Sequence, residues 1–573
     1  MASITKKIVR GHPYYYAREC KRVGGKPKIV WQKYLGRVED IVAAVERKRT
    51  GRDPIPRPER ESLLTELGAA AALYDLSRRL DLVGTIDRHV PKRGRGPSVG
   101  TYLELATLNR CMAPRSKAKI GAWFATTVLR RLIDIEPRQL SSQRFWDNMD
   151  RVSPEAISAI EAELTERLVA EFDLDLSRLL FDATNFFTFI DTFNERSTLA
   201  QRGHSKEGRA SLRLVGLALL VSADGHVPLL HETYRGNQTD APTFAGLSDA
   251  LVARVRQLSG AVEHVTIVFD KGNNSEANLA AVDASSLHFV GSLVATQHPE
   301  LLDIPPERFI SLASAGLPAV RAYRTTKEVF GQRRTVLVTY NENLFVAQSK
   351  TLLREIAKRQ RSLAEIRARL ERRRSGEVRG GRAPALAATR NAVNEVLKGR
   401  HMKELFDVAL TLRDNVPDLA YRFRQDAWEQ LQRTLLGKTL LFTGHHGWSD
   451  AEIVRAYRAQ HFVEDAFRHM KDPHHIALRP QHHWTDPKVR VHVFTCVLAL
   501  TLLSLLRREL AAKGFDLSIR RMMELLGTIR EVVMVFPPDD GQSDPTLRTT
   551  LTAMSAEQRA LFQALELGRY TDA

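Results

Sequence analysis

The feature that most constrains the fold is a series of short apolar segments between residues 176 and 294. Two of them, 176–181 and 265–269, end at Asp182 and Asp270. Short runs rich in Val, Ile, Leu and Phe, separated by Gly, Asn and Asp, predict buried strands. Further strands are expected at 212–222, 226–234 and 288–294, and helices at 240–257 and 275–284. This order, βββαβαβ, predicts an α/β fold in which the first and fourth strands lie side by side.

The region 296–440 interrupts this series. Within it, Ile356, Leu363 and Leu370 recur every seven residues, and a second helical pattern runs over 384–412. The simplest interpretation is an antiparallel helical hairpin at 349–412 with an Arg-rich outer face. The strand pattern returns at 439–443, and an apolar-striped helix is expected at 451–470.

The remaining segments show weaker patterns. Residues 8–38, with Tyr14–Tyr16 and a Val-Gly-Gly-Lys turn, predict a strand hairpin, and the Pro-rich stretch 49–60 predicts a linker. A helical pattern covers 61–168, and a strand is expected at 531–536.

Charge is concentrated in two places. The formal net charge is +18, and residues 1–60 hold 16 basic against 6 acidic side chains, while 349–382 hold 12 against 4. These two segments account for the whole excess. Such basic patches are typical of proteins that bind a polyanion such as DNA or RNA. A well-solvated surface helix is the alternative for either run alone.

Composition excludes several classes of protein. With 573 residues, 43% of them hydrophobic, the chain can bury a sizeable core and is not intrinsically disordered. Its three cysteines are far apart and fit neither a disulfide framework nor a zinc site, which favours the reducing cytoplasm. The N-terminal residues lack a signal-peptide pattern. The most apolar run, 493–506, is shorter than the ~20 residues that span a bilayer, so we expect a buried core helix and no membrane.

Three acidic residues, Asp182, Asp270 and Glu464, are candidates for metal-dependent phosphodiester cleavage. Helical spacing places one polar set on the face that carries Glu464: Tyr457, Gln460, His461, Arg468 and Lys471. Carboxylates on rigid elements can hold two Mg²⁺ or Mn²⁺ ions, which stabilise the attacking and leaving oxygens in phosphodiester cleavage. By spacing alone, a turn cap at Asp182 and a simple strand end at Asp270 stay open.

The sequence Tyr457-Arg-Ala-Gln460-His-Phe-Val-Glu464-Asp-Ala-Phe-Arg-His-Met-Lys471 resembles the Tyr-x2-Arg-x3-Glu-x6-Lys signature of insertion-sequence DDE transposases. Other blocks resemble that family in the same order along the chain: Phe181-Asp-Ala-Thr-Asn185, Gly203-His-Ser-Lys206, His231 to Asp240, and Val268-Phe-Asp-Lys-Gly272. The resemblance covers roughly residues 177–505. One position departs from the signature, because Gln460 stands where the family has Arg.

The resemblance implies an RNase H-like core, a mixed sheet flanked by helices, with a largely helical insertion before the last catalytic helix. It implies that Asp182, Asp270 and Glu464 are catalytic and bind Mg²⁺ or Mn²⁺, two ions in all. Phosphate or DNA contacts are then expected at a further set: Tyr457, Gln460, Arg468, Lys471, Lys271 and Lys206. Since Gln carries no charge, either Arg458 or Arg468 compensates for Gln460 or activity is reduced.

The expected domains are a basic β-hairpin and linker at 1–60, a helical DNA end-binding region at 61–170, core segments at 171–295 and 441–510, the insertion at 296–440, and a tail at 511–573. The implied activity is Mg²⁺-dependent cleavage of element ends and strand transfer into target DNA. The implied partner is DNA, bound by a homodimer in the bacterial cytoplasm at the nucleoid. Two alternatives stay open: an RNase H-like nuclease without strand transfer, and a catalytically decayed DNA-binding protein.

Overall fold

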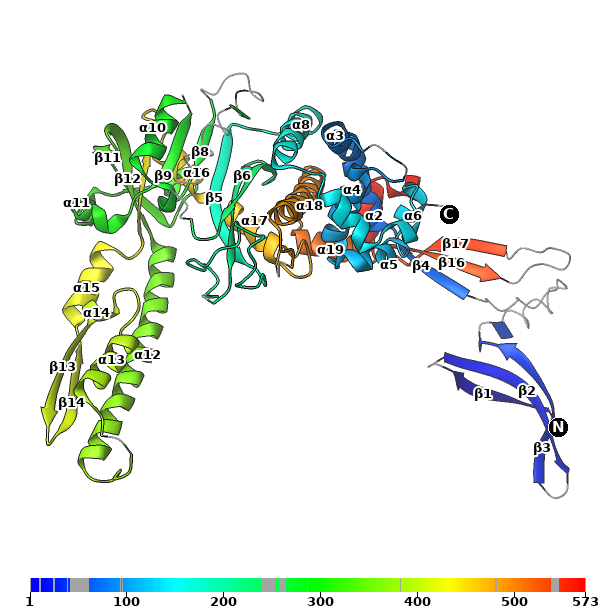
Figure 1. Ribbon diagram of the computed structural model, residues 1–573, viewed down its shortest axis with the longest axis horizontal. Coiled ribbons are helices and arrows are strands. Elements are labelled where there is room, and N and C mark those ends of the chain that lie inside the picture. The colour runs from blue at the N-terminus through cyan, green and yellow to red at the C-terminus, as the bar shows by residue number, and fades with distance from the viewer. Residues whose placement is uncertain are drawn as a thin grey trace. The chain divides into compact units, whose positions relative to one another are not determined.

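The computed structural model (Figure 1) describes residues 2–9, 12–23, 26–38, 40–41, 61–92, 94, 96–209, 211–238, 253–254, 256, 264–285, 287–381, 383–479, 482–536 and 546–571. The chain forms two compact units, one from residues 1–78, 115–145 and 509–573 and the other from 79–114 and 146–508. The predicted linker at 49–60 lies outside the described residues, and so does nearly all of the predicted helix at 240–257.

A nine-stranded mixed sheet dominates the second unit. Its strands are β5 (Arg178–Phe187), β6 (Leu214–Ser222), β7 (Pro228–Arg235), β8 (Thr266–Val268), β9 (His288–Ser292), β10 (Ile310–Ser311), β11 (Val320–Val329), β12 (Gln332–Asn341) and β15 (Lys438–Thr443). They lie in the order β10-β11-β12-β15-β9-β8-β5-β6-β7. The pairs β5–β8 and β8–β9 are parallel, and the other neighbours are antiparallel.

The predicted pairing of the first and fourth strands is confirmed, since β5 and β8 are parallel neighbours. The predicted end of the first strand at Asp182 is wrong. β5 continues to Phe187, because β6 pairs with it as far as Phe187 opposite Leu214. The antiparallel partner thus supports β5 well beyond the point where β8 stops.

Helices cover the middle of the sheet and account for the apolar strands there. All nine residues of β6 are buried, as expected for a strand covered on both faces. The covering helices include α8 (Pro154–Phe172) on β7, α10 (Glu276–Ala284) and α16 (Asp450–Arg458) on β9, and α17 (His461–Lys471) on β5 and β6.

One helix in the described part of the chain, α18 (Asp486–Ala512), is long and apolar enough to cross a membrane. It has 27 residues, more than the predicted run, and 94% of its most apolar window is buried inside the protein. It contributes Val491, Phe494 and Leu498 to a core cluster with α3 (Leu82–His89), α4 (Val99–Met112) and α8. That burial is typical of a core helix.

The other unit contains two small sheets. Strands β1 (Ala2–Val9), β2 (His12–Val23) and β3 (Lys26–Gly36) form a three-stranded antiparallel sheet, so the predicted hairpin is confirmed and gains β1. The helical pattern expected from residue 61 is wrong at its start. Residues 61–66 form β4 (Glu61–Glu66), which pairs with β16 (Arg530–Phe536) beside β17 (Thr546–Leu551). Residues 61–66 are a strand because they pair with β16, which lies more than 460 residues away along the chain. The local pattern of apolar residues does not indicate this pairing.

The remaining elements of this unit are short helices: α2 (Gly68–Arg79), α5 (Ile120–Phe124), α6 (Leu129–Leu132), α19 (Ile519–Gly527) and α20 (Ala556–Ala564). α7 (Ser142–Met149) lies at the boundary between the two units.

The predicted insertion at 296–440 is too long, because β10, β11 and β12 are part of the nine-stranded sheet. Residues 342–434 form an arm of helices and a hairpin (Figure 1). Its elements are α12 (Glu342–Arg374), α13 (Leu386–Val396), α14 (Met402–Leu405), β13 (Phe406–Arg413), β14 (Val416–Phe423) and α15 (Gln425–Thr434). The predicted seam is confirmed, since Ile356, Leu363 and Leu370 are buried in the arm core. The predicted second helix is wrong beyond Val396. Asp414 and Asn415 both have positive φ, which is typical of a two-residue turn between antiparallel strands.

Candidate active site

The two predicted catalytic aspartates lie at one level of neighbouring strands. Leu180 of β5 is paired with Val268 of β8, and Asp182 and Asp270 each follow two residues later. Asp270 is still extended, with φ −89° and ψ 165°. Because side chains alternate along a strand and neighbouring strands lie about 4.8 Å apart, both aspartates belong to the same face of the sheet.

Asp270 is held by two hydroxyl groups. Ser292 Oγ, from β9, and the Tyr457 hydroxyl, from α16, donate to Asp270 Oδ1 at 2.8 and 3.1 Å. Burial and the charge of Asp270 raise the pKa of Tyr457. The phenol therefore stays protonated and acts as a donor that fixes the orientation of the carboxylate.

Glu464 faces the same cavity as Asp270. This cavity has a volume of about 280 Å³, and its lining includes Asp270, Tyr457, Gln460, Glu464 and Thr439. Within the described residues, no Lys, Arg or His forms an ion pair with Asp270 or Glu464. The lining also includes Arg458 and His461. The two carboxylates supply oxygen ligands of the kind that a hard divalent cation prefers.

The predicted helix over 451–470 is two helices, α16 and α17. Between them, Gln460 N–H donates to Tyr457 O and Phe462 N–H to Ala459 O, at 3.0 and 2.9 Å. These i to i+3 bonds tighten the turn, as in a 3₁₀ segment. The predicted polar face is therefore not one surface, because Gln460 is 6% exposed whereas Glu464 is exposed.

Gln460 connects α17 to the strand that carries Asp182. Its Nε2 donates to Phe181 O at 2.8 Å, one residue before Asp182. Its Oε1 is buried without a hydrogen-bond partner. Gln460, which departs from the family signature, thus fixes the helix of Glu464 to β5. The phosphate contact predicted for Gln460 stays a prediction.

Two predicted phosphate-binding lysines contact the backbone of β5. Lys206 Nζ donates to Ala183 O at 2.6 Å. Lys471 Nζ donates to Thr184 Oγ1 and Asn185 O at 2.9 and 3.0 Å and lies 3.1 Å from Glu207. Burial lowers the pKa of Lys471, and the Glu207 carboxylate opposes that shift. In this structure both lysines hold β5 in place.

The other two predicted cations lie apart from these. Arg468 is 73% exposed and forms an ion pair with Asp465. Lys271 follows Asp270 directly, is exposed, and lines a second, larger cavity.

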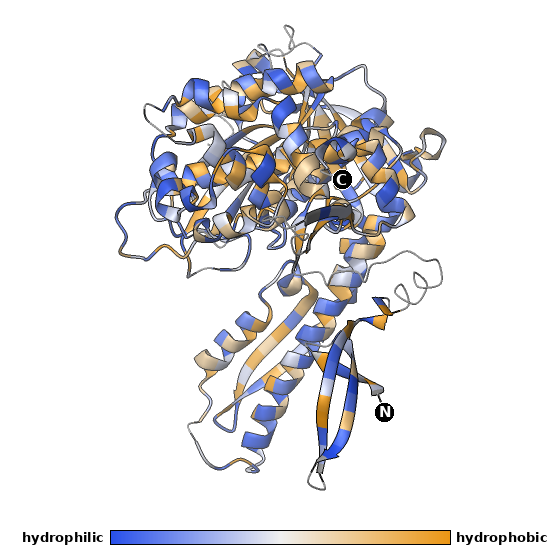
Figure 2. Cartoon of the chain, turned by 90° about the vertical axis from the view of Figure 1, so that its right-hand side faces the viewer, coloured by the Kyte–Doolittle hydropathy of each residue, from blue (hydrophilic) through white to orange (hydrophobic). Residues whose placement is uncertain are grey.

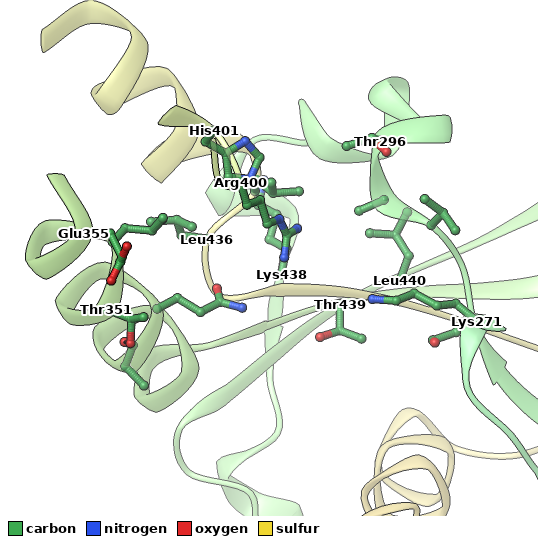
Figure 3. Close-up of a pocket in the computed structure, with 18 of the residues that line it drawn as sticks. Lys271, Thr296, Thr351, Glu355, Arg400, His401, Leu436, Lys438, Thr439 and Leu440 are labelled. Atoms are coloured by element: carbon green, nitrogen blue, oxygen red, sulfur yellow. The ribbon is translucent and has the colours of Figure 1, made fainter. Parts of the chain in front are cut away.

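This larger cavity, of about 610 Å³, shares Tyr457 and Thr439 with the first one. Figure 3 shows Lys271 extending toward Thr439, and Arg400 of the arm above Lys438, the first residue of β15, with Leu436 and Leu440 among the apolar wall residues. The sequence did not predict this cavity, because its lining joins Lys271, Lys438 and Arg400, which are distant from one another along the chain.

The three carboxylates do not form a ready-made metal site. Among the described residues, no group of three or more His, Cys, Asp and Glu side chains is close enough to hold a metal ion. The donor chemistry nevertheless fits a hard divalent cation, since carboxylate oxygens are what Mg²⁺ prefers. Asp270 and Glu464 supply two such groups to one cavity, and Asp182 lies on the adjacent strand.

A stripe of cations runs along α12. Its members are Lys350, Arg354, Lys358, Arg361, Arg369 and Arg372. Neighbouring members are three or four residues from each other, except for one step of eight residues between Arg361 and Arg369, across Glu365. This basic stripe is about 33 Å long and lies opposite the buried seam. All six side chains are exposed or largely so, and within the described residues none has an ion-pair partner. Figure 2 shows α12 as largely hydrophilic.

Substitution Gln460→Ala is expected to lower metal-dependent DNA cleavage by about 10- to 100-fold, because the link between α17 and Phe181 O is lost and a buried carbonyl loses its donor. Cleavage rates at saturating DNA measure this. A thermal unfolding curve is the control, since a 1–3 kcal/mol loss of stability is also expected. Unchanged cleavage would show that Gln460 does not position Glu464.

The solved structures similar to this chain include two transposase complexes. A piggyBac transposase synaptic complex with hairpin DNA, solved by cryo-electron microscopy, is 9% identical, with 82% of each chain covered and a TM-score of 0.36. A Mos1 transposase paired-end complex with the left transposon end is 10% identical, with 37% of this chain and 63% of that chain covered and a TM-score of 0.15. No protein-family model and no curated protein matches the chain.

Proposed function

We propose that this chain is the DNA transposase of an insertion sequence, acting by a DDE mechanism in which Asp182, Asp270 and Glu464 are the catalytic carboxylates. The observation that carries the proposal is the meeting of two elements distant in sequence. Asp270, which follows β8, and Glu464 of α17 face one cavity, and no Lys, Arg or His in the described part of the chain forms an ion pair with either of them. Asp182 lies level with Asp270 on the adjacent strand.

The arrangement of strands supports an RNase H-like core. Antiparallel β7, β6 and β5 are followed across the sheet by β8 and β9, which run parallel to β5. The arm enters between β12 and β15, before the helix that carries Glu464. This matches the position of the insertion implied by the family resemblance.

The same three carboxylates would hold Mg²⁺ or Mn²⁺. When bound, two such ions would activate water and stabilise the leaving oxygen of an in-line displacement. Because the described residues hold no assembled three-carboxylate group, completion of the site would accompany binding of metal or DNA. Tyr457 keeps Asp270 oriented through its hydrogen bond, and Gln460 fixes α17 to β5.

The basic stripe of α12 supports DNA as the partner. A row of unpaired cations about as long as one turn of duplex DNA can neutralise successive phosphates and release their counterions. The N-terminal sheet adds to this charge, since residues 1–38 hold ten basic side chains and one acidic one. Joining two element ends would bring two copies of the chain together as a homodimer, in the bacterial cytoplasm at the nucleoid.

Strand transfer tests the proposal. The purified protein is incubated with Mg²⁺, DNA carrying an element end and a target plasmid, and the products are analysed for joined molecules. The expected result is end DNA covalently joined to the plasmid. Cut ends without joined products would favour the nuclease alternative, and binding without cutting would favour the decayed DNA-binding protein suggested by Gln460.

A further inference from the structure

An exposed aromatic surface lies beyond the end of the strand that carries Asp182. Phe189, Phe193 and Trp484 are 56%, 90% and 60% exposed, and we call these three residues the aromatic surface. Phe189 contacts the Phe187 ring on one side and the His482 ring on the other, at 5.6 and 5.8 Å between centroids. Exposed Phe and Trp side chains of this size are not required by the fold, and grouped together they indicate a binding surface.

The loop that presents Phe193 is held firmly. Asp486, the first residue of α18, accepts hydrogen bonds from Ser197 Oγ, Thr198 N–H and Leu199 N–H at 2.7, 2.9 and 3.2 Å. Burial alone would raise the pKa of Asp486, but these hydrogen bonds lower it below its ordinary value. The carboxylate therefore stays charged near neutral pH and anchors the loop.

Further hydrogen bonds join the loop that carries Phe193 to the backbone of Trp484. Asn194 Nδ2 donates to Trp484 O at 3.2 Å. Arg213 donates to Asn194 O and Thr192 O at 2.9 and 2.8 Å. Because the backbone is fixed from several sides, Phe193 is exposed on a rigid support, and little conformational entropy is lost when it binds a partner.

Arginines surround the aromatic surface. The guanidinium groups of Arg209 and Arg479 lie over the Phe187 ring, 5.6 and 5.4 Å from its centroid. Arg202 donates to Thr192 Oγ1 at 3.2 Å, and Arg196 is exposed. The acidic neighbours are Asp191, Glu195, Glu207 and Asp486, of which Glu207 pairs with Lys471 and Arg479 and Asp486 bonds the loop at 197–199. Aromatic faces among arginines are typical of surfaces that bind unpaired nucleic acid.

We propose that the aromatic surface stacks against the bases of unpaired DNA next to the phosphate that is cut at Asp182. Phe187 ends β5 five residues after Asp182, which is about 17 Å of extended strand. A DNA strand at Asp182 therefore reaches Phe189 within a few nucleotides. The charge of the surrounding arginines favours DNA over an apolar protein partner. This inference rests on the proposed function, because it takes Asp182 as the point of cleavage.

The test uses the full-length protein without divalent metal, so that no DNA is cut. The probe is a duplex with a single-stranded extension that carries 2-aminopurine, whose fluorescence is quenched when the base stacks. Wild type should quench the probe and bind it more tightly than the blunt duplex. The variant Phe193→Ala/Trp484→Ala should lose the quenching and bind the extension about 5- to 150-fold more weakly, with duplex binding unchanged.

Two further variants make the result specific. Phe193→Trp should quench the probe as wild type does, because a larger ring can stack in the same place. Ile310→Ala removes an apolar side chain that is 69% exposed on strand β10 and should change nothing. Equal quenching and equal affinity in wild type and the double variant would overturn the proposal. A double variant that differs from wild type only in its oligomeric state would also overturn it.

Failure of this inference and failure of the proposed function are distinguishable. Loss of stacking is measured by fluorescence without metal, whereas the proposed function is measured by Asp182-dependent cleavage with Mg²⁺. Cleavage with unaltered quenching in the double variant would overturn only the stacking proposal. Quenching that depends on Phe193, without any cleavage by wild type, would overturn only the assignment as a transposase.

Discussion

Replacing Asp182 or Asp270 with Asn, or Glu464 with Gln, is expected to reduce Mg²⁺-dependent DNA cleavage at least about 1000-fold. In the proposed mechanism, each change removes one negative oxygen donor from the metal ions that would stabilise the attacking and leaving groups. Losing several kcal/mol of that stabilisation corresponds to such a factor. The measurement is the rate of end cleavage with a labelled DNA duplex at saturating protein.

DNA binding by these three variants in the absence of metal should equal or slightly exceed that of wild type, because a negative charge near the phosphates is removed. Asp465→Asn is the matched control. Asp465 is the acidic neighbour of Glu464 in sequence but pairs with Arg468, so cleavage should persist. Wild-type activity in Asp182→Asn would disprove the assignment of this site, whatever the DNA affinity.

Neutralising the basic stripe is expected to give the second-largest effect. The variant Arg354→Gln/Lys358→Gln/Arg361→Gln/Arg369→Gln should bind duplex DNA about 10²- to 10³-fold more weakly at 0.1 M salt. The slope of log K against log salt should become shallower by about 3 to 4, since each lost phosphate contact removes roughly 0.9. Titrations at several salt concentrations measure both quantities.

The arm also supplies a control with the same change in net charge. Arg367, Lys398, Arg422 and Arg424 are paired with Glu371, Glu395, Asp407 and Asp426. Replacing these four with Gln removes four positive charges from the same arm but leaves the stripe intact. If both quadruple variants shift the salt slope equally, general charge rather than the stripe governs binding, and the arm is a structural insertion.

The arm also shows where periodicity was informative. Ile356, Leu363 and Leu370 recur at helical spacing and are buried as predicted, because one helix face must pack against something. The segment after Val396 was not predictable in the same way. Residues 406–412 became a strand through the turn at Asp414 and Asn415 and the partner strand β14, and short apolar runs fit helix and strand equally well.

In the candidate site, too, some features were predictable from the local sequence and others depend on residues distant along the chain. The apolar runs before Asp182 and Asp270 predicted adjacent strands, and the β5–β8 register agrees. For Gln460, by contrast, the sequence predicts only a phosphate contact. Its hydrogen bond to Phe181 O joins residues 279 positions apart. Lys206 and Lys471 likewise bond the backbone of β5, which spacing within their own segments cannot reveal.

The amino-acid sequence by itself determined the α/β character of the central region, the places of six of the nine strands of its sheet, and the concentration of positive charge in two segments. These follow from local hydrophobic patterns and from composition, which act over a few residues. Only the tertiary structure decided that Glu464 shares a cavity with Asp270 while Gln460 turns into the core. It also decided that six arginines and lysines of α12 are exposed and form no ion pair with any residue that the structure describes. Those outcomes depend on which distant segments exclude water from one another, and that competition is settled by packing of the whole chain.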